Sequence, residues 1–373
     1  MSQTEIRRIG ILTGGGDCPG INAVIRAVAK TVMFERGWEC YGIEDGFLGL
    51  IEDHVRALSR WDVSNILTQG GTILGTSNKA NPQRYAVGMD EDGKPIFKDV
   101  RDRAMATVRK HEIDALVVIG GDGTMSCAAG MIPLGLRCVG VPKTIDNDLM
   151  YSHITFGFQT AVETATEALD RLHTTAASHH RIMVVELMGR NAGWLALHAG
   201  IASGSDIILI PEIPYQFDVL CDYCRVRMKD RKSFTIVAVS EGVRAVGGKQ
   251  FVHRTIADSP DPIRLGGIAG ALADQFESAT GVEARAVVLG HVQRGGTPCA
   301  GDRVLATRLG HSAAELLAAG QFNRLVVVQH GELGSVPIEE VAGKQRLIPL
   351  DSELIQVARA VGTCLGDQPM STV

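Results

Sequence analysis

Two aspartates and a threonine follow a short apolar run near the middle of the chain. Thr144, Asp146 and Asp148 alternate within Pro142–Asp148, directly after residues 137–141, which predict a buried strand. In parallel α/β sheets, ligands bind at the carboxyl ends of the strands. One carboxylate there can accept a hydroxyl proton while another holds a metal, as phosphoryl transfer requires. A polar loop whose aspartates cap the next helix explains the same residues, so this stretch alone leaves both interpretations open.

Three glycine-rich segments also follow predicted strands, namely Gly14–Gly16, Gly70–Gly75 and Gly120–Gly123. The first lies between a predicted strand, Ile6–Leu12, and a predicted amphipathic helix, Ile21–Phe34. Bare backbone amides at the start of a helix favour phosphate binding. The segment lacks the Gly-Lys-Ser/Thr of a P-loop, however, and a tight turn that needs glycine explains it equally well.

Charged side chains near the strand ends suggest a metal and an anionic substrate. Asp122, Asp146 and Asp148 offer the oxygen ligands that Mg²⁺ prefers. The second half of the chain places cationic side chains beside predicted strands: Arg181, Arg190, Arg285, His291 and Arg294. Together they suit a phosphorylated substrate, although any one of them could instead form a surface salt bridge.

The order of predicted elements indicates an α/β fold with mostly parallel sheets and ligand sites at the strand ends. Predicted strands and helices alternate throughout, and among the helices are Met125–Gly130 and Ile263–Thr280. A length of 373 residues favours two domains. Residues 85–97 contain a turn signal and are expected to form an exposed excursion.

Composition excludes several classes of protein. The net charge of −5 argues against non-specific nucleic-acid binding. No apolar run reaches the length that would span a membrane. The first eight residues are polar and charged, so we expect no secretory signal, and the eight cysteines are scattered as in reduced proteins. We therefore expect a cytoplasmic protein without nucleic-acid or membrane partners.

The chain resembles the 6-phosphofructokinase family in the order and spacing of five motifs over about residues 6–330. These motifs are Gly14-Gly15-Gly16-Asp17 with Gly20 and Asn22, Gly120–Thr124, Pro142–Asp148, Met188-Gly189-Arg190, and Gly290-His291 with Gln293–Gly296. The resemblance implies two Rossmann-like domains with the active site in the cleft between them. It also implies transfer of a phosphoryl group to the 1-hydroxyl of fructose 6-phosphate.

The resemblance further implies how the chain is divided. Residues 1–157 with 293–345 would form the domain that binds the phosphoryl donor. Residues 158–292 with 346–373 would form the domain that binds fructose 6-phosphate.

Roles for single residues follow from the same resemblance. Asp146 would accept the hydroxyl proton, Thr144 and Arg190 would act beside it on the transferring group, and Asp122 with Asp148 would hold Mg²⁺. The donor would contact Gly15, Asn78, Lys79, Gly120, Gly121, Asp122, Gly123 and Thr124. The sugar phosphate would contact Thr144, Asp146, Arg181, Met188, Gly189, Arg190, Glu241, Arg285, His291 and Arg294. Arg181 and Arg285 resemble arginines that a neighbouring subunit supplies, which implies a homodimer or homotetramer.

Two positions bear on the identity of the donor, and they disagree. Gly123 is similar to the ATP-using enzymes of the family, whereas pyrophosphate users have Asp there, and a carboxylate would repel a nucleotide phosphate. Lys143 is similar to the pyrophosphate users, and the combination of Gly123 with Lys143 resembles an atypical, ATP-using or mixed-substrate branch of the family. An added cation does not exclude ATP, so ATP is the expected donor and pyrophosphate the alternative. Asn78 stands where the family usually has an arginine, so Lys79 or another cation would substitute.

Other functions remain open from the sequence. A different kinase with a Gly-Gly-Asp-Gly loop, acting on NAD or a lipid, would not explain Pro142–Asp148 and Gly290–Gly296 together. A non-catalytic sugar-phosphate sensor is an alternative from another class. It has no physical need for Asp122, Asp146 and Asp148.

Overall fold

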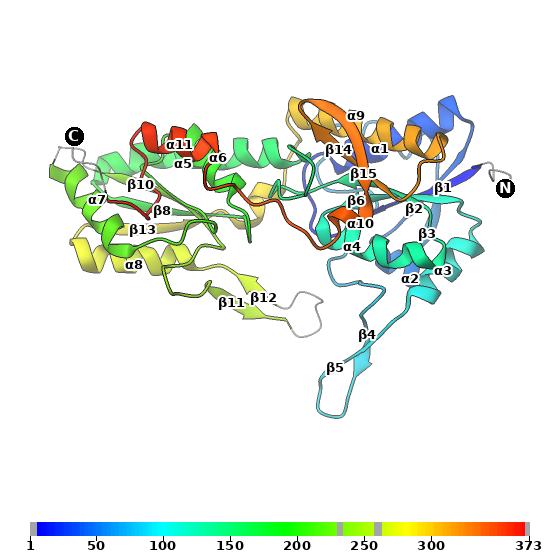
Figure 1. Ribbon diagram of the computed structural model, residues 1–373, viewed down its shortest axis with the longest axis horizontal. Helices are drawn as coiled ribbons and strands as arrows, with labels where there is room; N and C mark the ends of the chain where they lie inside the picture. Colours follow the sequence, from blue (N-terminus) through cyan, green and yellow to red (C-terminus); the bar gives the residue numbers. More distant parts are fainter. Residues whose placement is uncertain (1–5, 230–233, 257–262, 370–373) are drawn as a thin grey trace.

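The computed structural model describes residues 6–229, 234–256 and 263–369, and its two larger sheets lie side by side in one elongated molecule (Figure 1). The first sheet has seven strands in the order β15-β14-β7-β6-β1-β2-β3. It is parallel except at its edges, where β3 and β15 run antiparallel to their neighbours. The strands are β1 (Arg8–Thr13), β2 (Glu39–Ile43), β3 (Val55–Leu58), β6 (Ala115–Gly120), β7 (Cys138–Pro142), β14 (Arg324–Gln329) and β15 (Glu332–Pro337).

The second sheet has four parallel strands in the order β13-β8-β10-β9. They are β8 (Ile182–Leu187), β9 (Ile207–Leu209), β10 (Thr235–Ser240) and β13 (Ala284–Val288). The chain thus leaves the first sheet after β7, builds the second, and returns to the first with β14 and β15. The α/β fold with mostly parallel sheets that the sequence predicted is confirmed.

Helices cover both faces of each sheet, as parallel sheets require. On one side, α1 (Ile21–Glu35) and α9 (Ala300–Ala318) cover the first sheet, while α5 (Phe158–His179), α6 (Trp194–Ala202) and α11 (Glu353–Ala360) cover the second. The opposite face of the first sheet carries α2 (Phe47–Glu52), α3 (Arg101–Lys110), α4 (Asp122–Met131), the 3₁₀ turn η1 (Ile132–Leu134) and α10 (Ile338–Val341). The opposite face of the second carries α7 (Phe217–Lys229) and α8 (Ile268–Thr280). None of the helices in the described ranges is apolar and long enough to cross a membrane.

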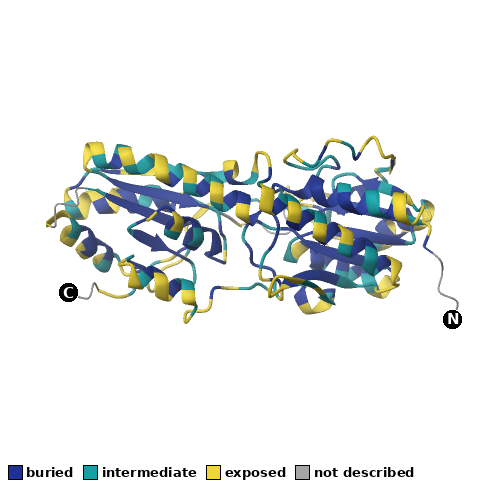
Figure 2. Ribbon diagram, turned by 90° about the horizontal axis from the view of Figure 1, so that it is seen from above, coloured by how far each residue is buried: buried dark blue, intermediate teal, exposed yellow. Residues whose placement is uncertain are grey.

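The apolar core follows the two-residue period of the strands. Ile9 and Ile11 of β1 pack beneath α1 and α9, whereas Leu12 packs on the opposite face. The core beneath α1 and α9 continues without a break beneath α5 and α6 through Ile145 and Phe156, so the two sheets share it. In Figure 2, dark buried strands accordingly fill both halves of the molecule.

Two predicted helix starts are wrong. The predicted helix Ile263–Thr280 begins with strand β12 (Ile263–Leu265), which pairs with β11 (Val252–Thr255), and α8 starts only at Ile268. Gly266 and Gly267 separate the two elements, with φ angles of 134° and 92° that other residues rarely adopt. The helix predicted to start at Met125 starts at Asp122 instead, so its first turn contains part of the glycine-rich motif.

The excursion predicted at residues 85–97 is the antiparallel hairpin of β4 (Tyr85–Met89) and β5 (Pro95–Lys98). It projects from the body of the molecule, on the same side as the hairpin of β11 and β12 (Figure 1). Most of its residues are exposed. Its turn is closed by Asp90, whose side chain accepts hydrogen bonds from the amides of Asp92 and Lys94.

Asp302 joins the long helix of the second sheet to the long helix of the first. It lies in the first turn of α9 and is fully buried. Its Oδ2 atom accepts hydrogen bonds from the amide and the hydroxyl of Thr160, in the first turn of α5, at 2.8 and 2.6 Å. A carboxylate at a helix N-terminus is favoured by unpaired amides and by the helix dipole.

We expect Asp302→Ala to lower the free energy of unfolding by roughly 2–3 kcal/mol, because it leaves a buried amide and hydroxyl without their acceptor. Equilibrium urea unfolding measures this. Asp170→Ala, at an exposed position of α5, is the control and should change stability by less than about 0.5 kcal/mol. Equal stabilities of the two variants would contradict the role of Asp302.

Candidate active site

The carboxyl ends of β1, β6 and β7 bring three loops together at one edge of the first sheet. The three strands are neighbours, with β6 in the middle. The amide of Gly14 donates to the carbonyl of Ile119 at 2.9 Å. A Cβ atom on Gly14 would lie 2.7 Å from the side chain of Thr124, and one on Gly120 would lie 2.3 Å from the Cβ of Thr124. Both glycines therefore permit a close approach that no other residue allows.

The first turn of α4 presents part of the glycine motif at this edge. Gly121 is the N-cap, Asp122 is half-buried and Gly123 is exposed. A Cβ atom on Gly123 would meet nothing within 4 Å. This position therefore borders open space, at a helix N-terminus that favours negatively charged groups.

Residues 76–78, which follow the glycine-rich segment Gly70–Gly75, pack on the first glycine loop (Gly14–Gly16). The amide of Gly15 donates to the carbonyl of Ser77 at 3.2 Å. The hydroxyl of Thr76 donates to the carbonyl of Gly15 at 2.6 Å. Gly15 has a φ angle of 78°, which favours glycine. Asn78 and Lys79 follow and are exposed, so both side chains lie at the surface beside this loop.

The three candidate carboxylates lie close together, and the charge of Asp122 helps to raise the pKa of both Asp146 and Asp148. Burial, followed by the charges of Asp146 and Asp122, raises the pKa of Asp148 to about 8. Burial also raises the pKa of Asp146, against the opposing effect of Arg294 and Lys143. The Oδ1 atom of Asp146 is buried and has no hydrogen-bond partner in the described part of the chain. An acceptor without a donor is costly inside a protein, and it fits a ligand that supplies the donor.

Two cations approach the carboxylates from different sheets. The buried Lys143 ammonium donates to the carbonyl of Gly16, and burial lowers its pKa. Arg294 comes from η2 (Gly290–Arg294), which follows β13 of the second sheet. It donates to the carbonyl of Asp17 at 2.9 Å. A Cβ atom on Gly16 would lie 2.7 Å from the Arg294 guanidinium, so that glycine admits the arginine.

The second sheet contributes the loops that follow β8, β10 and β13. Met188, Gly189 and Arg190 come directly after β8. The hydroxyl of Ser240 donates to the carbonyl of Gly189, and the amide of Met188 donates to the buried side chain of Gln293 at 3.4 Å. These bonds join the three loops to one another.

Glu241 and His291 lie at the same edge as these loops. Burial, with the charges of Asp146 and Glu186, raises the pKa of Glu241 to about 7. His291 belongs to η2 and is exposed.

Arg181 and Arg285 do not join this group within one chain. Arg181 precedes β8 and Arg285 is the second residue of β13, so both lie at the amino ends of these parallel strands, opposite Arg190 and Arg294. Arg181 pairs with Glu283 at 2.7 Å, and Arg285 also pairs with Glu283. Within one chain, the described structure therefore brings only Arg190, His291 and Arg294 of the five cationic groups to this edge.

Sequence reasoning also missed residues that contact the candidate loops. Gln345 donates to the Oδ2 atom of Asp148 at 3.2 Å, and the amide of Arg346 donates to the carbonyl of Asp148 at 2.7 Å. Gln345 also lines a cavity of about 520 Å³ at the carboxyl edge of the second sheet, with Asn191 and Glu212. Nearly 200 positions separate Gln345 from Asp148, and no local sequence motif indicates that the two residues are in contact.

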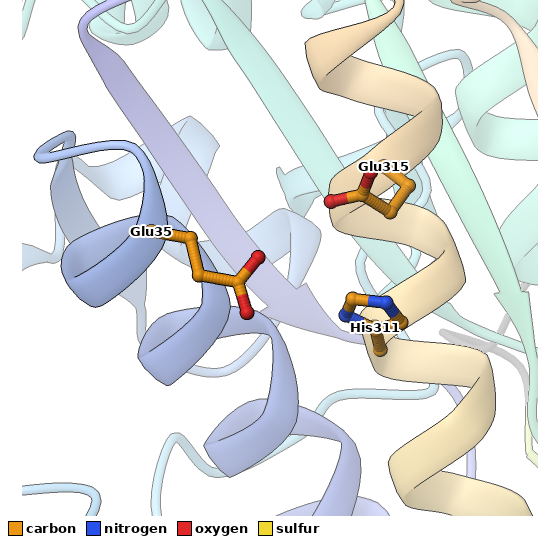
Figure 3. A group of neighbouring side chains, drawn as sticks. All are labelled: Glu35, His311 and Glu315. Carbon is orange, nitrogen blue, oxygen red and sulfur yellow. The ribbon is translucent and has the colours of Figure 1, made fainter.

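A second group of possible metal ligands lies away from these strand ends. Glu35 of α1 and His311 and Glu315 of α9 point toward one another on the helices that cover the first sheet (Figure 3). Glu35 and His311 are exposed, and Glu315 already pairs with Arg36 at 2.8 Å. Within the described residues, nothing beyond this proximity indicates that the group binds a metal.

Comparison with known proteins assigns the family. Residues 8–317 match the family described as Phosphofructokinase. The chain is 48% identical over 363 residues to "ATP-dependent 6-phosphofructokinase 2" of Clostridium perfringens, covering 97% of this chain and 99% of that one. It is 45% identical over 344 residues to "Pyrophosphate--fructose 6-phosphate 1-phosphotransferase" of Amycolatopsis mediterranei, covering 92% and 97%.

Solved structures show the same fold. A pyrophosphate-dependent phosphofructokinase from Nitrosospira multiformis superposes with a TM-score of 0.79, over 98% of this chain and 94% of that one. At 19% identity, this likeness concerns the fold alone. The sequence matches carry the assignment, and they span nearly the whole of both chains. The chain therefore belongs to the phosphofructokinase family.

Proposed function

We propose that this protein phosphorylates the 1-hydroxyl of fructose 6-phosphate, with Mg-ATP as the donor, giving fructose 1,6-bisphosphate. The observation that carries the proposal is the buried Oδ1 atom of Asp146, which lies beside Arg294 and Lys143 and has no hydrogen-bond partner among the described residues. A substrate hydroxyl would supply the missing donor. Family membership supports the same reaction.

In this proposal Asp146 accepts the proton of the attacking hydroxyl, and Thr144 orients the loop. The Thr144 hydroxyl already accepts a hydrogen bond from the amide of Asp146 at 3.0 Å, which limits the movement of the base. Arg190 and Arg294 would neutralise charge on the transferring group and on the sugar phosphate. Such fixed cations stabilise the transition state because they need no reorganisation.

The carboxylates fit a hard divalent cation. Asp122 and Asp148 offer oxygen ligands, and their mutual repulsion would be relieved by such an ion. Mg²⁺, when bound, would neutralise charge on the donor phosphates. Asp122 and Asp148 are the residues that would hold it.

ATP is the donor that we propose, because of the space at Gly123. A carboxylate there, about 4 Å from a phosphate oxygen, would cost roughly 4 kcal/mol at an effective dielectric of 20. Gly123 removes that charge and borders open space. The donor would also contact Gly15, Gly120, Gly121 and Thr124, with Asn78 and Lys79 at the surface beside them.

Pyrophosphate is the alternative donor, and one specific observation favours it. The Lys143 ammonium lies against the first glycine loop, where it could stabilise a compact anion. Relatives named as ATP-dependent reach 48% identity and support ATP, whereas a relative of 45% identity is named for pyrophosphate.

We also propose that the active enzyme is a homodimer or homotetramer. Met188, Gly189, Glu241 and His291 would contact the sugar within one subunit. Arg181 and Arg285, at the opposite edge of the same sheet, would reach the sugar phosphate of a neighbouring subunit.

The proposed division of the chain assigns residues 1–157 with 293–345 to the donor and 158–292 with 346–373 to fructose 6-phosphate. Strands β14 and β15, which return to the first sheet, support the first assignment. We propose that the enzyme acts in glycolysis in the cytoplasm. The eight free cysteines support a reducing compartment.

We expect Asp146→Asn to reduce kcat by about 10²–10⁴-fold, because the side chain can no longer accept a proton. Fructose 6-phosphate binding, measured by calorimetry, should stay within about threefold. Asp170→Asn, at an exposed site, is the matched control and should leave kcat unchanged. A kcat for Asp146→Asn within tenfold of the parent would rule out Asp146 as the base.

The raised pKa of Glu241 predicts a pH-dependent stability in the ligand-free protein. Its pKa of about 7 in the folded chain exceeds the unfolded value near 4.5. The contribution of protonated Glu241 to the free energy of unfolding is therefore fully present below pH 4.5, and it is lost as the pH rises through 7. Glu241→Gln should thus become more stable relative to the parent by about 1–3 kcal/mol between pH 5 and pH 8.

Urea unfolding at both pH values measures this difference. Glu91→Gln, in the exposed turn of the β4–β5 hairpin, is the control and should follow the parent at both values. If the stability of Glu241→Gln relative to the parent changes with pH no more than that of Glu91→Gln, the raised pKa of Glu241 is contradicted.

A further inference from the structure

The segment Gln345–Ile348, between α10 and α11, contacts the loop that contains the proposed base. Gln345 forms an antiparallel bridge with Leu149. The amide of Arg346 donates to the carbonyl of Asp148 at 2.7 Å, and its guanidinium donates to the carbonyl of Asn147 at 2.6 Å. Backbone and side-chain bonds thus fix this segment against the end of the Thr144–Asp148 loop.

The same segment also contacts the second sheet. The carbonyl of Arg346 accepts from the indole of Trp194 at 2.9 Å, and the guanidinium lies 4.1 Å from the ring centre. The amide of Ile348 donates to Glu212 at 3.0 Å. The Glu212 carboxylate accepts from the amide of Gly193 as well, at the N-terminus of α6. The segment is therefore held from both sheets.

The side chain of Gln345 joins the two candidate substrate loops directly. Its Nε2 donates to Oδ2 of Asp148 at 3.2 Å, and its Oε1 accepts from Nδ2 of Asn191 at 2.8 Å. Asn191 follows Arg190 in the chain. When Asp148 is ionised its carboxylate can only accept, which directs the NH₂ of Gln345 toward Asp148 and its oxygen toward Asn191.

We infer that Gln345 is a positioning residue. It fixes the orientation of the Asp148 carboxylate relative to the Arg190–Asn191 loop. This inference rests on the proposed function, in which Asp148 would hold the metal ion of the donor and Arg190 would contact the sugar phosphate. Groups that orient a metal-binding carboxylate through hydrogen bonds tune its geometry without touching the substrate. Gln345 bonds the Oδ2 atom of Asp148, and the hydroxyl of Thr144 bonds the same carboxyl group.

Gln345→Met tests the inference, because it keeps the length of the side chain and removes both hydrogen bonds. We expect kcat with fructose 6-phosphate and Mg-ATP to fall about 10–100-fold. KM for fructose 6-phosphate should stay within about threefold, since Gln345 acts on orientation in the transition state rather than on binding. The melting temperature should stay within about 5 °C of the parent.

Two further variants distinguish a positioning role of Gln345 from a non-specific effect of the substitution on the folded structure. Gln356→Met alters an exposed glutamine of α11 that bonds the carbonyl of Asp351 at 2.9 Å, and it should leave kcat unchanged. Asn191→Ala removes the partner on the acceptor side. If Gln345 acts through Asn191, the double variant should lose less activity than the product of the two single losses.

Hydrogen exchange supplies a readout that does not depend on turnover. In Gln345→Met, amides of residues 144–150 and 188–193 should exchange faster, whereas those of α5 and α9 should not. A parent enzyme that is active, with a Gln345→Met kcat within twofold, would overturn the inference and leave the proposed function standing. An inactive parent would overturn the proposed function, and unchanged exchange in both loops would also overturn the link through Gln345.

Discussion

The buried carboxylates beside β7 are the constraint on which the rest of the site depends. Asp146 and Asp148 are held near Asp122 at a strand end, where burial and mutual repulsion raise the pKa of both. Such an arrangement destabilises the ligand-free chain, since each charged form loses hydration. Lys143 and Arg294 offset part of this cost for Asp146. The remaining cost is one that a metal ion and a phosphorylated substrate would relieve.

Close packing of loops makes this concentration of charge possible. Gly14 and Gly120 let Thr124 approach, and Gly16 admits the Arg294 guanidinium from the other sheet. Because β1, β6 and β7 are adjacent and parallel, their ends meet at a single edge. The core shared by both sheets beneath α1, α5 and α9 then fixes the second sheet beside that edge. The fold therefore acts mainly by positioning, which is what phosphoryl transfer requires of a protein.

Local sequence predicted the features that depend on local physics. Short apolar runs predicted the buried strands, and the strand before Thr144 was placed correctly because its apolar run ends at Pro142. The start of α4 was missed, since glycines disfavour helices, although Gly123 lies in its first turn. Ile263–Leu265 was mistaken for helix because a strand of three residues is too short to show a distinguishing period.

Features that depend on distant residues were beyond sequence reasoning. Arg181 and Arg285 have the right type, but only the polarity of β8 and β13 shows that they lie at the opposite edge. Gln345 contacts Asp148 across nearly 200 positions, and its surroundings resemble an ordinary polar turn. Such contacts arise from the path of the chain between the two sheets, and neither propensity nor spacing encodes that path.

The most direct measurement is the initial rate with fructose 6-phosphate and Mg²⁺, with ATP and pyrophosphate offered in separate assays. The account predicts turnover with ATP, at a kcat/KM at least about tenfold above that for pyrophosphate, because Gly123 removes the charge that would repel a nucleotide. Turnover with pyrophosphate alone would contradict it and make Lys143 the residue that decides the donor. No turnover with either donor would contradict the proposed catalysis itself and favour a sugar-phosphate sensor.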